Sequence, residues 1–423
     1  MTMYLQGSGA GRNALTTLFD REHLFEPAER HQPRAWDDMQ DAEEITPGGR
    51  GVTYQVIGNV GYGVGAPSEG GDYSVARTMD NVDLTTTSAQ LDGVIQLSDK
   101  YINAAKDDGS FYGDAMAQAV IENTLQYYTW CDIVLGPGYG TFQLASVNGA
   151  VVTNTVVQCD TDEWNFQLRR GMTVEFRFGG SQEHTAKLVS VDYKTGRIEL
   201  DAAGTISDGA GIYLDDTYGK TAPNGLRSIV DNGDLAPTID GGVRADYPYL
   251  DCISIGTAGA GADDFTEEAL DELLDNVTWE QDFVPTELRL NNGLFRAWKK
   301  ITRNDRMMTL PGKGAVTADG GTKGEAPAFF YGDGKIPFRL DRNWPGRTVH
   351  AIYRPGLRRN ILRKPDWFSE KGGPMFDKVP GDNGVGWKYA FVGSILGDIN
   401  VSSRKYNSSG RRLGFKDPAF GDV

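Results

Sequence analysis

The feature that most constrains this chain is a long stretch of alternating residues at 51–92. Val52, Tyr54 and Val56 alternate with polar residues on the outgoing side, and residues 73–79 alternate again on the return. A period of two predicts extended strands, so the stretch predicts a long β-hairpin with a Gly-, Pro- and Ser-rich apex. Because an isolated two-stranded ribbon is marginal in water, either the body of this chain or a neighbouring copy must cover it.

The rest of the chain divides around this hairpin. Its 423 residues are enough for two or three domains, and its 54 glycines favour turns and loops over a helical bundle. The expected parts are an N-terminal arm at 1–50, the hairpin at 51–92, a strand and long helix at 93–140, an inserted all-β module at 141–218 and an α+β domain at 219–423.

A strand predicted at 94–98 leads into a long helix predicted at 110–135. The helix carries two apolar stripes, so it is expected to pack on more than one side. The first stripe consists of Met116, Ala119, Val120, Asn123, Tyr127 and Trp130, and the second of Ile121, Leu125 and Tyr128. The sequence Gly-Pro-Gly at 136–138 is expected to end the helix.

Residues 141–218 change character, because short strand-like runs recur between turn residues. The predicted strands are Val151–Gln158, Thr173–Phe178, Ala186–Tyr193, Arg197–Leu200 and Gly211–Leu214. Several short strands at this spacing predict a small β-barrel or sandwich inserted in the chain.

Residues 219–423 mix helices and strands. Asp264 is predicted to cap a helix, whose apolar stripe consists of Leu270, Leu273, Leu274 and Val277. The other expected elements are a strand at 285–290, a helix at 293–301, a Gly-rich stretch at 311–324, and strands at 336–340, 349–353, 387–395 and 399–401. This order predicts an α+β domain with a partly antiparallel sheet.

The charge of the chain is uneven. The formal net charge is −16, yet residues 339–423 contain 16 Lys and Arg against 8 Asp and Glu, a net charge of about +8. A chain this acidic is not expected to coat nucleic acid with its whole surface. The basic C-terminal stretch either contacts phosphates or forms a solvated face and a partner for acidic neighbours. The sequence has no run of about 18 apolar residues and no signal-peptide core, so we expect no membrane span and synthesis in the cytoplasm.

The cysteines and histidines form no recognisable reactive site. Cys131, Cys159 and Cys252 lie far apart, and we expect buried free thiols rather than a disulfide framework or a zinc site. The four histidines belong to no metal-binding or catalytic motif; they are His23, His31, His184 and His350.

Glycine clusters and acidic runs have structural explanations. Residues 61–65 and 136–140 look like phosphate-binding loops, but neither has a GxGxxG pattern between a strand and a helix. Lys313 is not followed by the Ser or Thr of a P-loop. The acidic run at 208–216 lacks the alternating oxygen ligands of a calcium loop, and the carboxylates at 263–264 suit a helix start. The chain is therefore predicted not to be an enzyme, with no catalytic, cofactor-binding or metal-binding residue and no cofactor.

The order of these elements resembles the major capsid proteins of tailed bacteriophages, which have the Hong Kong 97 fold. Each motif is weak alone, and the specificity comes from their order over most of residues 51–412. The segments that carry the resemblance are Leu91–Asp99, Ser110–Leu135, Gly225–Val230, Thr266–Leu274, Thr286–Trp298, Ile336–Arg342, Trp344-Pro345, Val349–Leu357, Trp367 and Ser402–Lys405.

The resemblance implies a structural role for each part of the chain. Residues 51–92 would be an extended loop lying over a neighbour, 93–140 a peripheral domain with a spine helix, 141–218 an insertion, and 219–423 an axial domain with the closing peripheral strands. Copies would form pentamers and hexamers of an icosahedral head in the virion, enclosing double-stranded DNA. Portal, scaffolding and decoration proteins would be further partners, and the basic C-terminal region would contact DNA weakly. Some members crosslink through a lysine in the extended loop, but residues 51–92 contain none, so no covalent ladder is expected on denaturing gels.

Two other functions remain open from the sequence. An encapsulin, a bacterial compartment on the same fold, is the nearer alternative, and gene neighbours would separate it from a phage head. A carbohydrate-binding or hydrolytic enzyme using the β module is the alternative of a different class. An acidic pair within residues 201–216 that is needed for activity would favour that enzyme.

Overall fold

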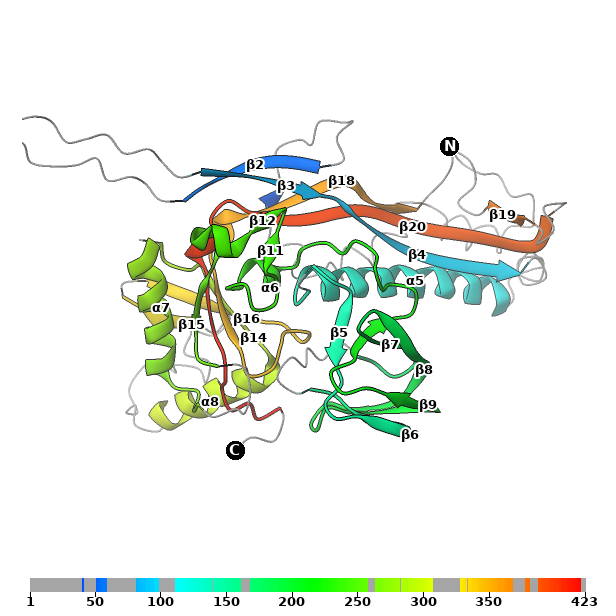
Figure 1. Cartoon of the computed structure of the whole chain (residues 1–423), viewed down its shortest axis with the longest axis horizontal. Helices are drawn as coiled ribbons and strands as arrows, with labels where there is room; N and C mark the ends of the chain where they lie inside the picture. The colour runs from blue at the N-terminus through cyan, green and yellow to red at the C-terminus, as the bar shows by residue number, and fades with distance from the viewer. Residues whose placement is uncertain are drawn as a thin grey trace, which may run out of the picture.

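In the computed structural model the chain forms three packed parts, each with its own apolar core (Figure 1). The structure describes residues 40–41, 51–58, 81–98, 111–138, 140–160, 168–257, 263–281, 283–306, 328–332, 334–367, 377–380 and 387–419. The predicted α+β class is confirmed.

A long, narrow sheet forms the first part. Its long antiparallel strands are β4 (Ala89–Ser98), β18 (Leu357–Trp367) and β20 (Trp387–Ser403), and its short edge strands are β1 (Gln40–Asp41) and β19 (Asp377–Pro380). With 17 residues, β20 spans about 56 Å and sets the length of the sheet. The helix α5 (Phe111–Leu135) runs along one face of it (Figure 1).

The strand β4 alternates between a covered face and an open face. Ala89 and Leu91 are buried, whereas Gln90 and Asp92 are exposed. At position 93 a Cβ atom would lie 3.2 Å from the ring of Tyr127, so glycine lets the helix approach the sheet closely. The sheet is therefore a plate with α5 on one side.

The helix α5 packs against two different cores, but the two predicted stripes do not divide between them, because Tyr127 of the first stripe and Tyr128 of the second both pack on the core of the plate. Tyr127, Cys131 and Val134 pack in the core under the plate. Ile133 packs in the core of the β module, and Trp130 contacts both cores. The helix ends at Leu135, directly before the predicted Gly-Pro-Gly stop.

A two-stranded ribbon lies on the plate. Its strands β2 (Gly51–Ile57) and β3 (Asn81–Thr87) pair antiparallel over their full length. The inward side chains Val56, Val82 and Leu84 belong to the core of the plate, and burying each contributes about 1.5–3 kcal/mol. The sequence left open whether the chain's own body or a neighbouring copy covers the ribbon. For the inward side chains of β2 and β3, the cover is the chain's own body. The predicted return at 73–79 lies outside the described residues.

Residues 143–214 form a six-stranded antiparallel sheet, which one bridge between its edges closes into a β-barrel. Its strands follow the order β5-β10-β7-β8-β9-β6, and the bridge between Val147 and Cys159 joins the two edges. Closing the sheet removes exposed edges and encloses an apolar core. The strands are β5 (Gln143–Ser146), β6 (Val151–Gln158), β7 (Thr173–Phe178), β8 (Ser181–Asp192), β9 (Arg197–Ile206) and β10 (Gly211–Leu214).

The third part is a six-stranded mixed sheet with two helices on one face. The helices are α7 (Glu267–Gln281) and α8 (Asn292–Arg306). The sheet order is β13-β21-β17-β14-β16-β15, with β13–β21 and β14–β16 parallel and the other pairs antiparallel. The strands are β13 (Ile253–Ile255), β14 (Glu287–Leu290), β15 (Ala328–Tyr331), β16 (Gly334–Leu340), β17 (Val349–Ile352) and β21 (Gly410–Arg412).

Short elements connect the three parts. They are α6 (Leu226–Ile229), β11 (Thr238–Ile239), β12 (Gly242–Val243), and the 3-10 turns η1 (Arg244–Asp246), η2 (Pro248–Leu250), η3 (Arg354–Gly356) and η5 (Tyr406–Ser408). No described helix is long and apolar enough to cross a membrane.

Three predictions about elements are wrong in detail. Thr266, not Asp264, caps α7, because its hydroxyl accepts the backbone N–H of Ala269. The separate strands expected at 387–395 and 399–401 are one strand, β20. The strands β5 and β18 were not predicted, since neither has a regular alternation of apolar residues. The predicted Gly-rich stretch at 311–324 lies outside the described residues.

Candidate functional site

Most of the motifs that suggested chemistry have structural roles. The described acidic side chains at 208–216 act in turns and surface pairs: Asp208 accepts the backbone N–H of Gly149, and Asp216 pairs with Lys220. The prediction that Asp263 and Asp264 lie at the start of a helix is wrong. Their carboxylates lie near Arg412 and Lys416 instead. Across the described ranges no group of His, Cys, Asp and Glu could hold a metal ion. The glycine clusters at 61–65 and 312–314 lie outside those ranges.

The three cysteines are buried free thiols, as predicted. Burial raises the pKa of Cys131 to about 12, and burial with the nearby Asp231 outweighs Arg411 to raise the pKa of Cys252 to about 12. Burial also raises the pKa of Cys159. Thiols held in the neutral form are poor nucleophiles, so these cysteines belong to the packing.

A partly buried polar cluster fixes the ribbon to the body. The hydroxyl of Tyr54, on β2, donates to Oδ2 of Asp240 at 2.6 Å and lies 2.6 Å from the hydroxyl of Tyr406. Asp240 lies in the turn between β11 and β12, and Tyr406 lies in η5. Asn224 donates to the other oxygen of Asp240 at 2.7 Å. These four residues, Tyr54, Asn224, Asp240 and Tyr406, are called the ribbon anchor below.

The backbone around the ribbon anchor is also bonded to the ribbon. The carbonyl of Asp240 accepts the backbone N–H of Thr85 on β3 at 3.0 Å. Asn400, on β20, accepts the N–H of Asn224 at 2.8 Å and donates to the carbonyl of Thr87 at 2.5 Å. Gly242 leaves room for Leu84, which a Cβ atom there would displace. Ribbon, connecting turn and plate therefore form one hydrogen-bonded junction.

The electrostatics of the ribbon anchor follow from its burial. Desolvation raises the pKa of Asp240, and the hydroxyls and amide that donate to it offset part of this effect. Burial together with the neighbouring Asp240 raises the pKa of Tyr54 and of Tyr406, so both stay protonated as donors. The two tyrosine hydroxyls therefore serve as hydrogen-bond donors within the cluster.

A row of basic side chains crosses the six-stranded sheet on the face away from α7 and α8. Arg289, His350 and Arg411 are paired across β14, β17 and β21, and each is at most 2% exposed. We call them the buried basic row. His350 lies directly opposite Arg289 on one neighbouring strand and Arg411 on the other. Like charges directly opposite one another in a sheet repel, so His350 has to be neutral. Burial, followed by the nearby arginines, holds the pKa of His350 well below its usual value. Trp344 donates its indole N–H to Nδ1 of His350 at 2.9 Å.

Acidic groups compensate both arginines of the buried basic row. Arg289 pairs with Glu287 at 2.9 Å and lies 3.8 Å from Asp341. Arg411 pairs with Asp231 at 2.6 Å and with Asp234 at 2.9 Å. The sheet is therefore joined to the rest of the chain through charge pairs, whereas its other face is joined to the helices through apolar contacts.

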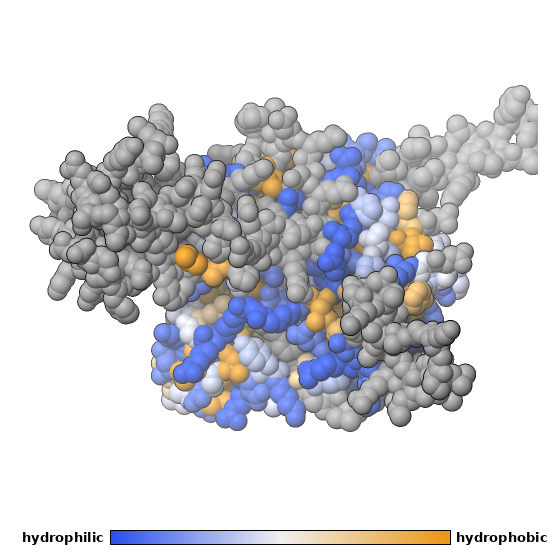
Figure 2. Space-filling model, turned by 180° about the vertical axis from the view of Figure 1, so that it is seen from behind, coloured by the Kyte–Doolittle hydropathy of each residue, from blue (hydrophilic) through white to orange (hydrophobic). Residues whose placement is uncertain are grey.

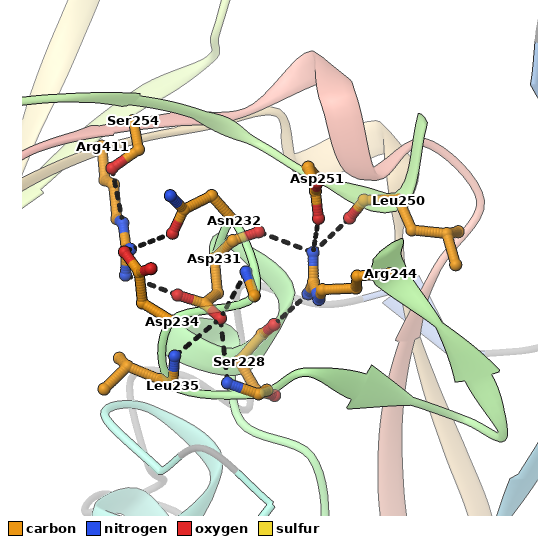
Figure 3. A network of polar contacts seen from close by, with 12 residues as sticks. Ser228, Asp231, Asn232, Asp234, Leu235, Arg244, Leu250, Asp251, Ser254 and Arg411 are labelled. Carbon is orange, nitrogen blue, oxygen red and sulfur yellow. Dashed lines mark hydrogen bonds and ion pairs between the residues drawn. The ribbon is translucent and has the colours of Figure 1, made fainter. Parts of the chain in front are cut away.

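Asp231 is the centre of the larger network in Figure 3, which links α6 to β21. One carboxylate oxygen receives Arg411, and the other accepts the backbone N–H groups of Gly233, Leu235 and Ala236 at 2.9–3.1 Å. Beside it, Arg244 donates to the carbonyls of Ser228 and Asp231, both at 2.6 Å, and to that of Leu250. These bonds satisfy a charged segment that the chain buries between its first and third parts.

Two arginines of the basic C-terminal stretch are paired within the subunit. Arg411 is buried on Asp231, and Arg412 binds Glu272 and the carbonyl of Ala269. The sequence left open whether this stretch contacts phosphates or pairs with acidic neighbours. Arg411 and Arg412 pair with acidic neighbours.

The functional residues found here were not predicted from the sequence. Among the histidines, His350 is buried in the basic row, His184 bonds to the carbonyl of Ala202, and His23 and His31 lie outside the described residues. Tyr54 was assigned only to the apolar face of a strand. Its partner Asp240 is 186 residues away, and no local pattern signals that contact.

No protein-family model matches the chain, and no curated protein matches it by sequence. Solved structures do match it over nearly its whole length. The capsid of cyanophage A-1(L) is 10% identical, with a TM-score of 0.47 over 92% of this chain and 93% of that one. The capsid of Myoviridae phage XM1 is 10% identical, with a TM-score of 0.45 over 90% and 91%. A virus-like particle from Pyrococcus furiosus is 7% identical, with a TM-score of 0.41 over 93% and 96%.

These three structures are of capsids and a virus-like particle, the class that the order of elements in the sequence resembles. TM-scores below 0.5 carry no argument for function, which has to rest on the geometry of this chain.

Proposed function

We propose that this chain is a structural shell subunit, the major capsid protein of a bacteriophage head. Its copies assemble into pentamers and hexamers of an icosahedral shell that encloses double-stranded DNA. The observation that carries the proposal is the two-stranded ribbon β2–β3, which is fixed on the plate by buried apolar side chains and by the ribbon anchor.

The ribbon is fixed on the plate. Its base is fixed by the ribbon anchor and by three buried apolar side chains, so its direction relative to the plate is fixed. Its outer side chains at the base, among them Thr53, Asp83 and Thr85, are exposed and polar. The two strands pair from Gly51↔Thr87 to Ile57↔Asn81. A fixed ribbon with a polar outer face suits contact with a neighbouring copy.

The charge of the chain suits a shell that holds DNA without coating it. The net charge is −16, and Arg411 and Arg412 are engaged inside the subunit. Exposed basic side chains near the C-terminal end of β20, such as Arg404, contact the enclosed DNA. Portal, scaffolding and decoration proteins are the further partners expected in a phage head.

The test is to purify the chain and examine it by light scattering and negative-stain electron microscopy over a range of concentrations, alone and with its scaffold. The proposal predicts rings and closed shells. A strict monomer at every concentration, with no shells even beside the scaffold, would overturn it. The absorbance ratio at 260 and 280 nm of particles from infected cells then tests for enclosed DNA.

A further inference from the structure

The helix α7 presents an acidic row on its outward side. Glu268, Glu272, Asp275 and Trp279 follow one another at i, i+4, i+7 and i+11, opposite the buried leucine stripe. Trp279 is 78% exposed, although tryptophan is normally covered. Exposed Asp271 broadens the row by one residue. These five residues are called the acidic row below.

The helix α8 presents the opposite charge. Arg296, Lys299 and Lys300 are exposed at i, i+3 and i+4, whereas Leu294 and Trp298 on the other side are buried in the sheet core. Arg296, Lys299 and Lys300 are called the basic face below.

The two charged surfaces lie on different flanks of one layer. Both helices cover the same face of the six-stranded sheet, because both contribute to the same core. In Figure 1 α7 stands at the left end of the molecule and α8 runs along the bottom. On the face seen in Figure 2, described hydrophobic residues form separate spots among hydrophilic ones. The opposite charges of the acidic row and the basic face offer a contact between two copies.

We propose that the acidic row of one copy binds the basic face of α8 of the next copy, head to tail, with Trp279 covered at the centre of the contact. A head-to-tail contact between two different surfaces closes into a ring when the rotation between copies allows it. Opposite charges on two flanks specify this order and disfavour a symmetric pair, in which like would meet like. The inference rests on the proposed shell function and names the residues that join neighbours within one ring.

Two carboxylates of the acidic row already have partners and are left unchanged in the test. Glu272 binds Arg412, and Asp275 accepts the hydroxyl of Tyr331 at 2.6 Å. The first variant is Glu268→Lys with Asp271→Lys, which changes the charge of the acidic row from −4 to 0 and places two lysines on it. The second is Arg296→Glu with Lys300→Glu, which changes the charge of the basic face from +3 to −1.

Each variant alone places like charges across the contact. Two reversed charges are expected to weaken ring formation about 100-fold at low salt, and added salt should reduce the defect. A control on the barrel reverses two exposed charges of the same sign, Glu199→Lys with Asp215→Lys, and should form rings like the original chain. Circular dichroism and thermal unfolding check that every variant is folded.

Mixing the variants gives the sharpest result. The introduced lysines on α7 of the first variant fit the introduced glutamates on α8 of the second, and the unaltered surfaces fit each other, so the mixture should form rings of alternating variants. Alternation closes only with an even number of copies. The mixture should therefore give hexamers and open assemblies without pentamers, and combining all four changes in one chain should restore pentamers and closed shells.

The outcomes separate this inference from the shell function. Normal rings from either variant alone, or pentamers from the mixture, overturn the proposed contact and leave the shell function standing. An original chain that forms no rings at all contradicts both.

Discussion

Replacing Arg411 with methionine removes the cation that lies on the buried Asp231. Arg411 is 2% exposed and Asp231 is 0% exposed, with 2.6 Å between their nearest atoms. The second partner, Asp234, is 66% exposed, so its pairing contributes little. The loss is therefore dominated by a carboxylate left buried without its counter-charge, which costs about 3–5 kcal/mol.

A loss of this size is a large share of the roughly 5–15 kcal/mol that stabilises a folded protein. Denaturant unfolding of unassembled subunits measures it, and the fluorescence of Trp344, which is bonded to His350 in the buried basic row, reports on the affected sheet. The matched control is Arg339→Met on β16 of the same sheet. Arg339 is 50% exposed and lies 3.7 Å from Glu287, so its loss should cost under about 1 kcal/mol. Equal losses for the two variants would refute the reasoning.

Three further predictions concern the ribbon, the buried histidine and the barrel. Tyr54→Phe leaves Asp240 buried with one donor fewer, so it should cost about 1–3 kcal/mol and speed amide hydrogen exchange in β2 and β3; unchanged exchange would contradict the anchor. Because the folded pKa of His350 is depressed, the folded state binds fewer protons than the unfolded state. Stability should fall as the pH drops below about 6.5, by up to about 1.36 kcal/mol per pH unit until the folded pKa is reached. His350→Asn, which keeps an acceptor for Trp344, should remove this part of the pH dependence, and parallel profiles would disprove it. The segment 141–218 should unfold cooperatively as a separate protein, because β5 and β10 at its two ends are paired; a chain with no cooperative thermal transition would argue against an independent barrel.

Regular local patterns made much of the fold predictable. The strands at 151–158, 173–178 and 211–214 have the predicted bounds, because each is a short strand-like run between turn residues. The long helix was predictable from apolar residues on more than one side, and α5 packs between the plate and the barrel.

Elements defined by their partners could not be predicted in this way. The strand β18 is rich in arginine and contains Pro365, and its pairing with β20 shifts register between Arg363 and Asp366. Its extended form depends on the 17-residue partner strand, not on its own alternation. The cap of α7 was misassigned because both Asp264 and Thr266 are good caps, and only the geometry selects Thr266.

The candidate site lay beyond any local pattern. Tyr54 and Tyr406 are 352 residues apart in the sequence, and the buried basic row exists only because the register of three strands aligns its members. Composition does not predict which charged side chains are buried, because arginine is mostly exposed in folded proteins. The sequence did provide the ribbon and its need for cover, and the structure shows that the chain's own body covers the inward side chains of β2 and β3.

The most direct test of the central claim is a cryo-electron microscopy reconstruction of the particles that the purified chain forms. The account predicts a closed shell of five- and six-membered rings, with the ribbon beyond Ile57 and Asn81 lying against a neighbouring copy. Particles in which each ribbon folds back on its own subunit, or a chain that forms no shell, would contradict it.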